Sequence, residues 1–145
     1  MRKYMPTIAQ LIDRLSIVTL KSIKIHENKE EYEKEAHEIM NDINEIIGEK
    51  KIVLDGQMVR AIQVNAKINE MIWANESFVR KGESTMPPEE IGRRLQLTHA
   101  MNRVRNQAMN VISNLVGERK DLKLDYMDAE MTKKFGYDFG GIFNE

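Results

Sequence analysis

Residues that interrupt helices are confined to a few positions in this chain, and their placement constrains the fold more than any other feature. All three prolines lie at positions 6, 87 and 88. In the long segments that they leave uninterrupted, apolar residues recur every three or four positions, which is the pattern of helices that bury one face. The alternation of apolar and polar residues that marks strands is missing. We therefore predict an all-α fold, an up-down bundle of about four helices with a C-terminal extension.

Local start and stop signals place the boundaries of these helices. The four helices are expected at residues 7–25, 29–47, 57–81 and 88–116. Thr7 is placed to cap the first helix, Gly48 to end the second and Gly117 to end the fourth. The segment between the second and third helices contains an Asp-Gly pair and is expected to be a connection. Residues 26–28 contain neither glycine nor proline, so the first two helices are either separate or one long helix.

The helical pattern weakens after Gly117, which indicates two regions. We assign residues 1–117 to the helical bundle and residues 118–145 to the extension. The extension ends in glycines and aromatic residues, whose side chains gain much by burial; these are Tyr137, Phe139 and Phe143. We expect the extension to dock on the bundle or on a neighbouring subunit, and the sequence does not distinguish the two.

Charge and cysteine content limit the partners. The chain has 22 basic and 23 acidic residues and a formal net charge of -1, which argues against a general affinity for nucleic acid or acidic membranes. It has no cysteine, so disulfides, thiolate metal sites and cysteine nucleophiles are excluded. Near the N-terminus, Gln10, Asp13 and Arg14 interrupt the apolar run. We therefore expect neither a signal peptide nor a membrane span, and a cytoplasmic location.

The second helix is rich in acidic residues that could bind a divalent metal. Helical carboxylates three or four residues apart can hold such an ion, and the candidates here are Glu31, Glu35, Glu38 and Asp42. The Glu-Glu-x-x-Glu pattern with which all-α nucleotide pyrophosphatases bind magnesium is broken at Lys34. A solvated helix face with local charge pairs is the simpler interpretation, so we predict no cofactor.

Polar residues follow the third and fourth helices at nearly the spacing of the apolar ones. Those on the third helix are Asn65, Asn69, Asn75, Glu76 and Arg80, and those on the fourth are His99, Asn102, Arg105, Asn106 and Asn110. Asparagine has only a modest helix propensity, so a purely exposed face would not especially favour it. Three interpretations remain open: an interhelical network, a pocket in which Arg105 binds a carboxylate or phosphate, and the partly exposed flanks of the core.

Nucleic acid is not predicted as a partner, although the fourth helix is rich in arginine. Its arginines are spread around the helix, and the chain shows neither a helix-turn-helix pattern nor an aromatic platform; they are Arg93, Arg94, Arg103 and Arg105.

Two segments carry a family resemblance. The run Leu-Ile-Asp-Arg-Leu-Ser-Ile-Val occupies residues 11–18, and an Asn-x-x-Arg-Asn pattern is formed by Asn102, Arg105 and Asn106. In both, the chain resembles a small helical family of unknown function from phage and bacterial genomes. The resemblance implies a helical bundle with a polar site that joins Asp13 and Ser16 to the three residues of the second pattern. It implies no activity.

The helical register supports part of that site independently. Asp13 and Ser16 lie three residues apart beside Ile12 and Leu15, so both can face the fourth helix at the edge of a core. A pair between Asp13 and Arg105 would explain why an arginine lies on a mostly apolar side.

We conclude from the sequence that this is a non-enzymatic helical binding or structural protein, expected to self-associate. The predicted site comprises Asp13, Ser16, Asn69, Glu76, Asn102, Arg105 and Asn106. The alternative is a metal-dependent all-α nucleotide or phosphate hydrolase, in which the acidic second helix holds magnesium and Arg105 binds a small anionic ligand.

Overall fold

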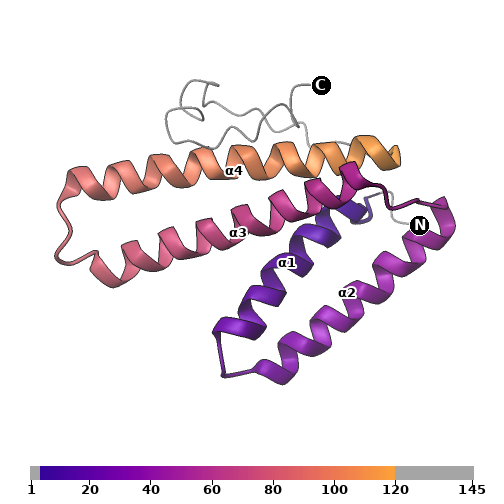
Figure 1. Ribbon diagram of the computed structural model, residues 1–145. Helices are drawn as coiled ribbons and strands as arrows, with labels where there is room; N and C mark the ends of the chain where they lie inside the picture. The colour runs from indigo at the N-terminus through magenta and orange to yellow at the C-terminus, as the bar shows by residue number, and fades with distance from the viewer. Residues whose placement is uncertain (1–3, 120–145) are drawn as a thin grey trace.

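The computed structural model describes residues 4–119, which form an all-α bundle of four helices. The helices are α1 (Ile8–Lys24), α2 (Lys29–Lys50), α3 (Gly56–Gly82) and α4 (Pro88–Val116), and Figure 1 shows their arrangement. The all-α prediction is confirmed, and the described part of the chain contains no strand.

The helix starts follow local capping signals. Thr7 and Gln10 form a capping box at the start of α1, in which each side chain accepts a hydrogen bond from the backbone N–H of the other residue. The Asp55 side chain accepts a hydrogen bond from the Met58 backbone N–H at the start of α3. At the end of α4, Gly117 adopts a φ of 72°, a left-handed conformation that glycine takes without strain. These residues explain why the first, third and fourth helices lie within a residue or so of their predicted positions.

The joint between α1 and α2 is a sharp turn, so the first two helices are separate. Asn28 has a φ of 61°, and asparagine tolerates this left-handed conformation better than most residues.

One predicted boundary is wrong. Helix α2 does not end at Gly48 but runs through it to Lys50, and Lys51 adopts the left-handed conformation instead. A glycine inside a helix destabilises it by only about 1 kcal/mol, which the packing of the neighbouring Ile43 and Ile46 on the core can offset.

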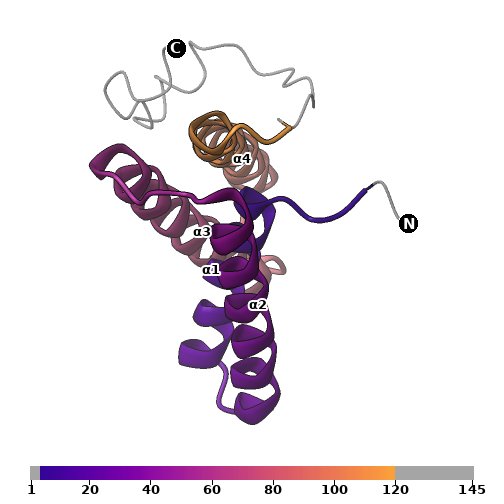
Figure 2. The same cartoon turned by 90° about the vertical axis from the view of Figure 1, so that its right-hand side faces the viewer.

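The four helices are arranged as two hairpins that diverge from one end (Figure 1). Helices α3 and α4 pack along one another as a long hairpin, and α1 packs on both of them. Helix α2 packs along α1, and the second view shows the α1–α2 hairpin projecting from the long hairpin (Figure 2).

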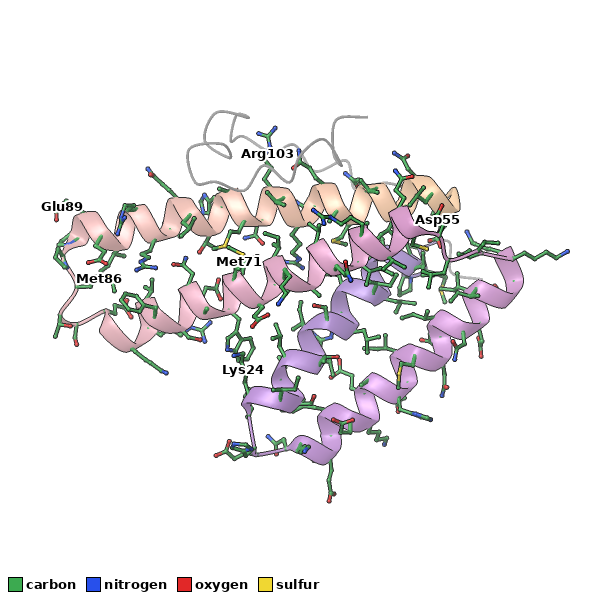
Figure 3. All side chains as sticks on the ribbon, in the orientation of Figure 1. Lys24, Asp55, Met71, Met86, Glu89 and Arg103 are labelled. Atoms are coloured by element: carbon green, nitrogen blue, oxygen red, sulfur yellow. The ribbon has the colours of Figure 1, made fainter. Side chains whose placement is uncertain are left out.

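The core has two parts. One lies where the hairpins meet, and its buried residues are Ile8, Ala9, Met58, Ala61 and Ile112. The other lies between α3 and α4 and includes Ile68, Met101 and Val104, with Met71 packed against it (Figure 3). A polar network formed by residues of α1, α3 and α4 lies between the helices that these two clusters hold together.

The chain after α4 returns to the start of α1. The Glu118 carboxylate accepts hydrogen bonds from the Ile8 backbone N–H at 3.2 and 3.3 Å, and it lies 3.7 Å from Lys50 Nζ. A carboxylate at a helix N-terminus is favoured by the exposed amides there. Arg119 lies over the Tyr4 ring and donates a hydrogen bond to the Met5 carbonyl. The predicted docking of the aromatic residues beyond position 119 lies outside the described residues.

Candidate functional site: a buried polar network and two cavities

An ion pair between α1 and α4 forms the centre of the site. Arg105 donates from Nε to Asp13 Oδ1 at 2.9 Å and from Nη2 to Asp13 Oδ2 at 2.6 Å. This two-point geometry is the strongest that arginine and a carboxylate form. Asp13 is only 6% exposed, so the pair joins two helices inside the bundle.

Two asparagines of α3 complete the coordination of Asp13. Asn65 and Asn69 donate from Nδ2 to Asp13 Oδ1 at 3.1 and 2.9 Å. They are four residues apart, which places both amides on the same face of the helix. Asn69 also donates to Ser16 Oγ at 3.2 Å. Three helices therefore meet at one carboxylate.

These partners keep Asp13 ionised. Burial by itself raises the pKa of the carboxyl group. The hydrogen bonds from Arg105, Asn69 and Asn65, together with the charge of Arg105, outweigh burial and lower the pKa below its ordinary value. A buried charge of this kind is tolerated because it is fully hydrogen-bonded.

The structure brings together most of the predicted site residues. Asn102 joins the network by accepting a hydrogen bond from Arg105 Nη1 at 3.3 Å. Glu76 stands outside it and pairs with Arg80 of its own helix at 3.3 Å. Asn106 is half-buried and does not join the network of the described residues, because one residue after Arg105 it lies about 100° further around the helix.

A second polar cluster lies nearer the loop between α3 and α4. Asn75, which is 5% exposed, donates to Thr98 Oγ1 at 2.8 Å and to the Arg94 carbonyl at 3.0 Å. Arg94 donates from Nη1 to Asn75 Oδ1 at 3.2 Å and stacks over the Phe78 ring at 4.3 Å. Its buried Nε–H has no partner among residues 4–119. The carboxylate that pairs with Arg94 belongs to Glu90, and its Oε1 lies 3.9 Å from Arg94 Nη2.

The described residues line two cavities that adjoin the first network. The larger, about 470 Å³, is an apolar groove between α1, α2 and α3, lined mainly by aliphatic side chains such as Ile12, Leu15, Ile43, Ile47, Leu54 and Ile62. The smaller, about 360 Å³, lies on the Arg105 side and has a polar floor formed by Asn69, Asn102 and Arg105.

The acidic residues of α2 do not form a metal site. Glu31, Glu38 and Asp42 are exposed, and Glu35 pairs with Arg14 of α1 at 2.6 Å. Within residues 4–119, no group of three or more histidine, aspartate or glutamate side chains is placed to hold a metal.

Some members of the two clusters could not be selected from the sequence. Asn65 was one of several asparagines on a polar face, and its spacing to Asn69 was the signal that both reach one partner. Thr98 carried no signal, because a single threonine in an apolar stripe usually packs as a small core residue. Arg94 was one of four arginines distributed around α4, and only the helix packing shows which of them is covered.

Comparison of the chain with protein-family models, curated proteins and solved structures found no match. The resemblance to a phage and bacterial family therefore stays a prediction. None of the helices in residues 4–119 has the length and apolar character needed to cross a membrane.

Proposed function

We propose that this chain is a non-enzymatic helical binding protein that acts as an assembly of copies of itself. The observation that carries the proposal is the apolar groove between the α1–α2 hairpin and α3. A soluble chain that leaves such a groove open gains free energy when another apolar surface covers it.

The groove exposes large aliphatic side chains at its edge. Leu54 is 63% exposed and Ile47 is 38% exposed, although both line the groove. Ile23 and Val53, near the two ends of the α1–α2 hairpin, are 67% and 81% exposed. These side chains provide the kind of apolar contact that forms the centre of a protein interface.

The distribution of charge favours a second copy of the same chain as the occupant. Helix α2 carries eight carboxylates and three lysines, whereas α3 and α4 together carry eight basic residues and four acidic ones. Within one chain, α2 packs along α1 and not along α4. In a dimer with twofold symmetry, the acidic helix of each copy can pack against the basic hairpin of the other, so the same favourable contact forms twice.

Sedimentation velocity across a concentration series tests the proposal. We expect the wild type to be a dimer or larger, and the Ile47→Asp/Leu54→Asp variant to be a monomer because two charges would be buried in the interface. Met5→Asp is the matched control: Met5 is 56% exposed, precedes α1, does not line the groove and lies outside the helices proposed to pair between copies. A monomeric wild type, or equal dissociation of the groove and control variants, would overturn the proposal.

A further inference from the structure

The smaller cavity beside Arg105 has the size and lining of a site for a small ligand. Its volume of about 360 Å³ lies at the low end of the range for small-molecule pockets. Ile17 and Leu20 of α1 and Ile72 and Trp73 of α3 form an apolar wall beside the polar residues of the lining. Glu76 and Arg80 also line the cavity, and their side chains are 45% and 76% exposed, which places them at its mouth.

The charges around this cavity balance. The Arg105 guanidinium is already neutralised by Asp13, whose lowered pKa keeps it ionised at neutral pH. Glu76 and Arg80 form a second pair of opposite charges. A simple anion, which one of the three interpretations of the sequence placed at Arg105, would meet no net positive charge here. A ligand that carries one charge of each sign is matched better.

The lining offers a partner for each end of such a ligand. Hydrogen bonds to Asp13 and Asn102 account for three of the five N–H groups of Arg105 within the described part of the chain, and its side chain is 29% exposed. The remaining N–H groups, with Arg80, can donate to a carboxylate. The Glu76 carboxylate and the Trp73 ring can bind an ammonium group.

The pair at the mouth can exchange partners without a large loss of stability. Exposed ion pairs within one helix contribute little, because water already solvates both charges. The ligand's ammonium group can therefore replace Arg80 beside Glu76, and Arg80 can turn to the ligand's carboxylate.

We propose that this cavity binds a small aliphatic amino acid as a zwitterion, with its carboxylate toward Arg105 and Arg80, its ammonium group at Glu76 and its side chain against the apolar wall. This site lies on the Arg105 side of the network and shares only Leu20 with the lining of the groove between copies.

Isothermal titration calorimetry of the full chain with leucine, valine and methionine tests the proposal. N-acetylleucine lacks the ammonium group, leucinamide lacks the carboxylate, and inorganic phosphate is a simple anion. We expect at least one of the three amino acids to bind. For leucine, we expect both derivatives to bind at least tenfold more weakly, and phosphate not to compete. Failure of all three amino acids to bind, or equal binding of leucine and N-acetylleucine, would overturn it.

A matched pair of variants assigns the ammonium group to Glu76. Glu76→Gln should weaken amino acid binding at least tenfold, whereas Glu70→Gln should leave it unchanged. Glu70 is also on α3, is 50% exposed and pairs with a basic residue of its own helix, Lys67 at 3.6 Å, but does not line the cavity. Because both glutamates are exposed, neither variant should unfold the protein, which circular dichroism checks. Equal effects of the two variants would contradict the assigned orientation.

Discussion

Each of the two polar clusters combines an asparagine of α3 with an arginine of α4, but the guanidinium groups of the two arginines are paired differently. In the first, Asp13 binds Arg105 at two points, with distances of 2.6 and 2.9 Å. In the second, Arg94 stacks on Phe78, its carboxylate partner is 3.9 Å away, and its buried Nε–H has no partner in residues 4–119. Only the first cluster is a closed unit in which removal of one member leaves a buried charge.

The difference has a topological origin. The first cluster receives a residue from α1, whereas the second lies between α3 and α4 alone. The third helix brings a carboxylate within hydrogen-bonding distance of Arg105, whereas Glu90, which belongs to α4 itself, is 3.9 Å from Arg94. The first cluster therefore links the two hairpins, and we expect the stability of the whole bundle to depend on it more than on the second.

Removal of the carboxylate should have the largest effect. Asp13→Ala leaves Arg105 unpaired in a mostly buried position and should lower the free energy of unfolding by about 3 kcal/mol. Urea denaturation measures this. The double variant Asp13→Ala/Arg105→Met should lose less than Asp13→Ala alone, because no uncompensated charge remains. If the unfolding free energy of Asp13→Ala lies within about 1 kcal/mol of the wild-type value, the ion pair contributes little to stability.

Addition of a carboxylate should distinguish the two clusters. Asn69→Asp places a second negative charge beside Asp13 and should destabilise the protein by about 2 kcal/mol at neutral pH. Asn75→Asp places its new charge beside Arg94, whose attraction should partly offset the lost amide hydrogen bonds, so the loss should be smaller. Thermal denaturation of the two variants side by side checks this order. The reverse order would mean that the contrast between the clusters is wrong.

The pH dependence of stability should report the first cluster. The pKa of Asp13 is lower in the folded protein than its ordinary value of 3.8, so the unfolded chain binds the proton more tightly. The stabilisation is therefore complete above pH 3.8 and is lost as the pH falls through the folded pKa. The difference in unfolding free energy between wild type and Asp13→Asn should be constant near neutral pH and shrink in acid. A difference independent of pH would contradict the assignment of this pH dependence to Asp13. Asn75→Ala is the control: it removes no titrating group, so its difference from the wild type should not change in acid.

Removal of the second arginine should have the smallest effect. Arg94→Met removes the buried Nε–H that has no partner in residues 4–119, but it also removes the guanidinium that stacks on Phe78 and donates to Asn75 Oδ1. Because these changes oppose each other, the free energy of unfolding should change by less than about 1 kcal/mol in either direction. Chemical denaturation measures the change, and a loss as large as that of Asp13→Ala would make the two clusters equivalent.

Much of the first cluster could be predicted from the sequence, and the second could not. Asp13 and Ser16 share the inner face of a strongly periodic helix, so the register alone pointed them toward Arg105. Asn75 and Thr98 lie on helices whose apolar stripes are broader and less distinct. Which of their polar residues is covered depends on how α3 and α4 rotate against each other, and no local signal sets that rotation.

The sequence by itself determined the helices, because their ends depend on caps and turns such as Thr7, Asp55, Pro88 and Gly117 that act within a few residues. Gly48 shows the limit of that rule, because the packing of Ile43 and Ile46 continues the helix through a residue that locally favours its end. The tertiary structure alone decided that the hairpins diverge, that Asn65 rather than Asn106 reaches Asp13, and that Arg105 is neutralised by a residue far away in the chain. These outcomes depend on the positions of whole helices, which are set by the summed packing of many side chains and not by any one segment.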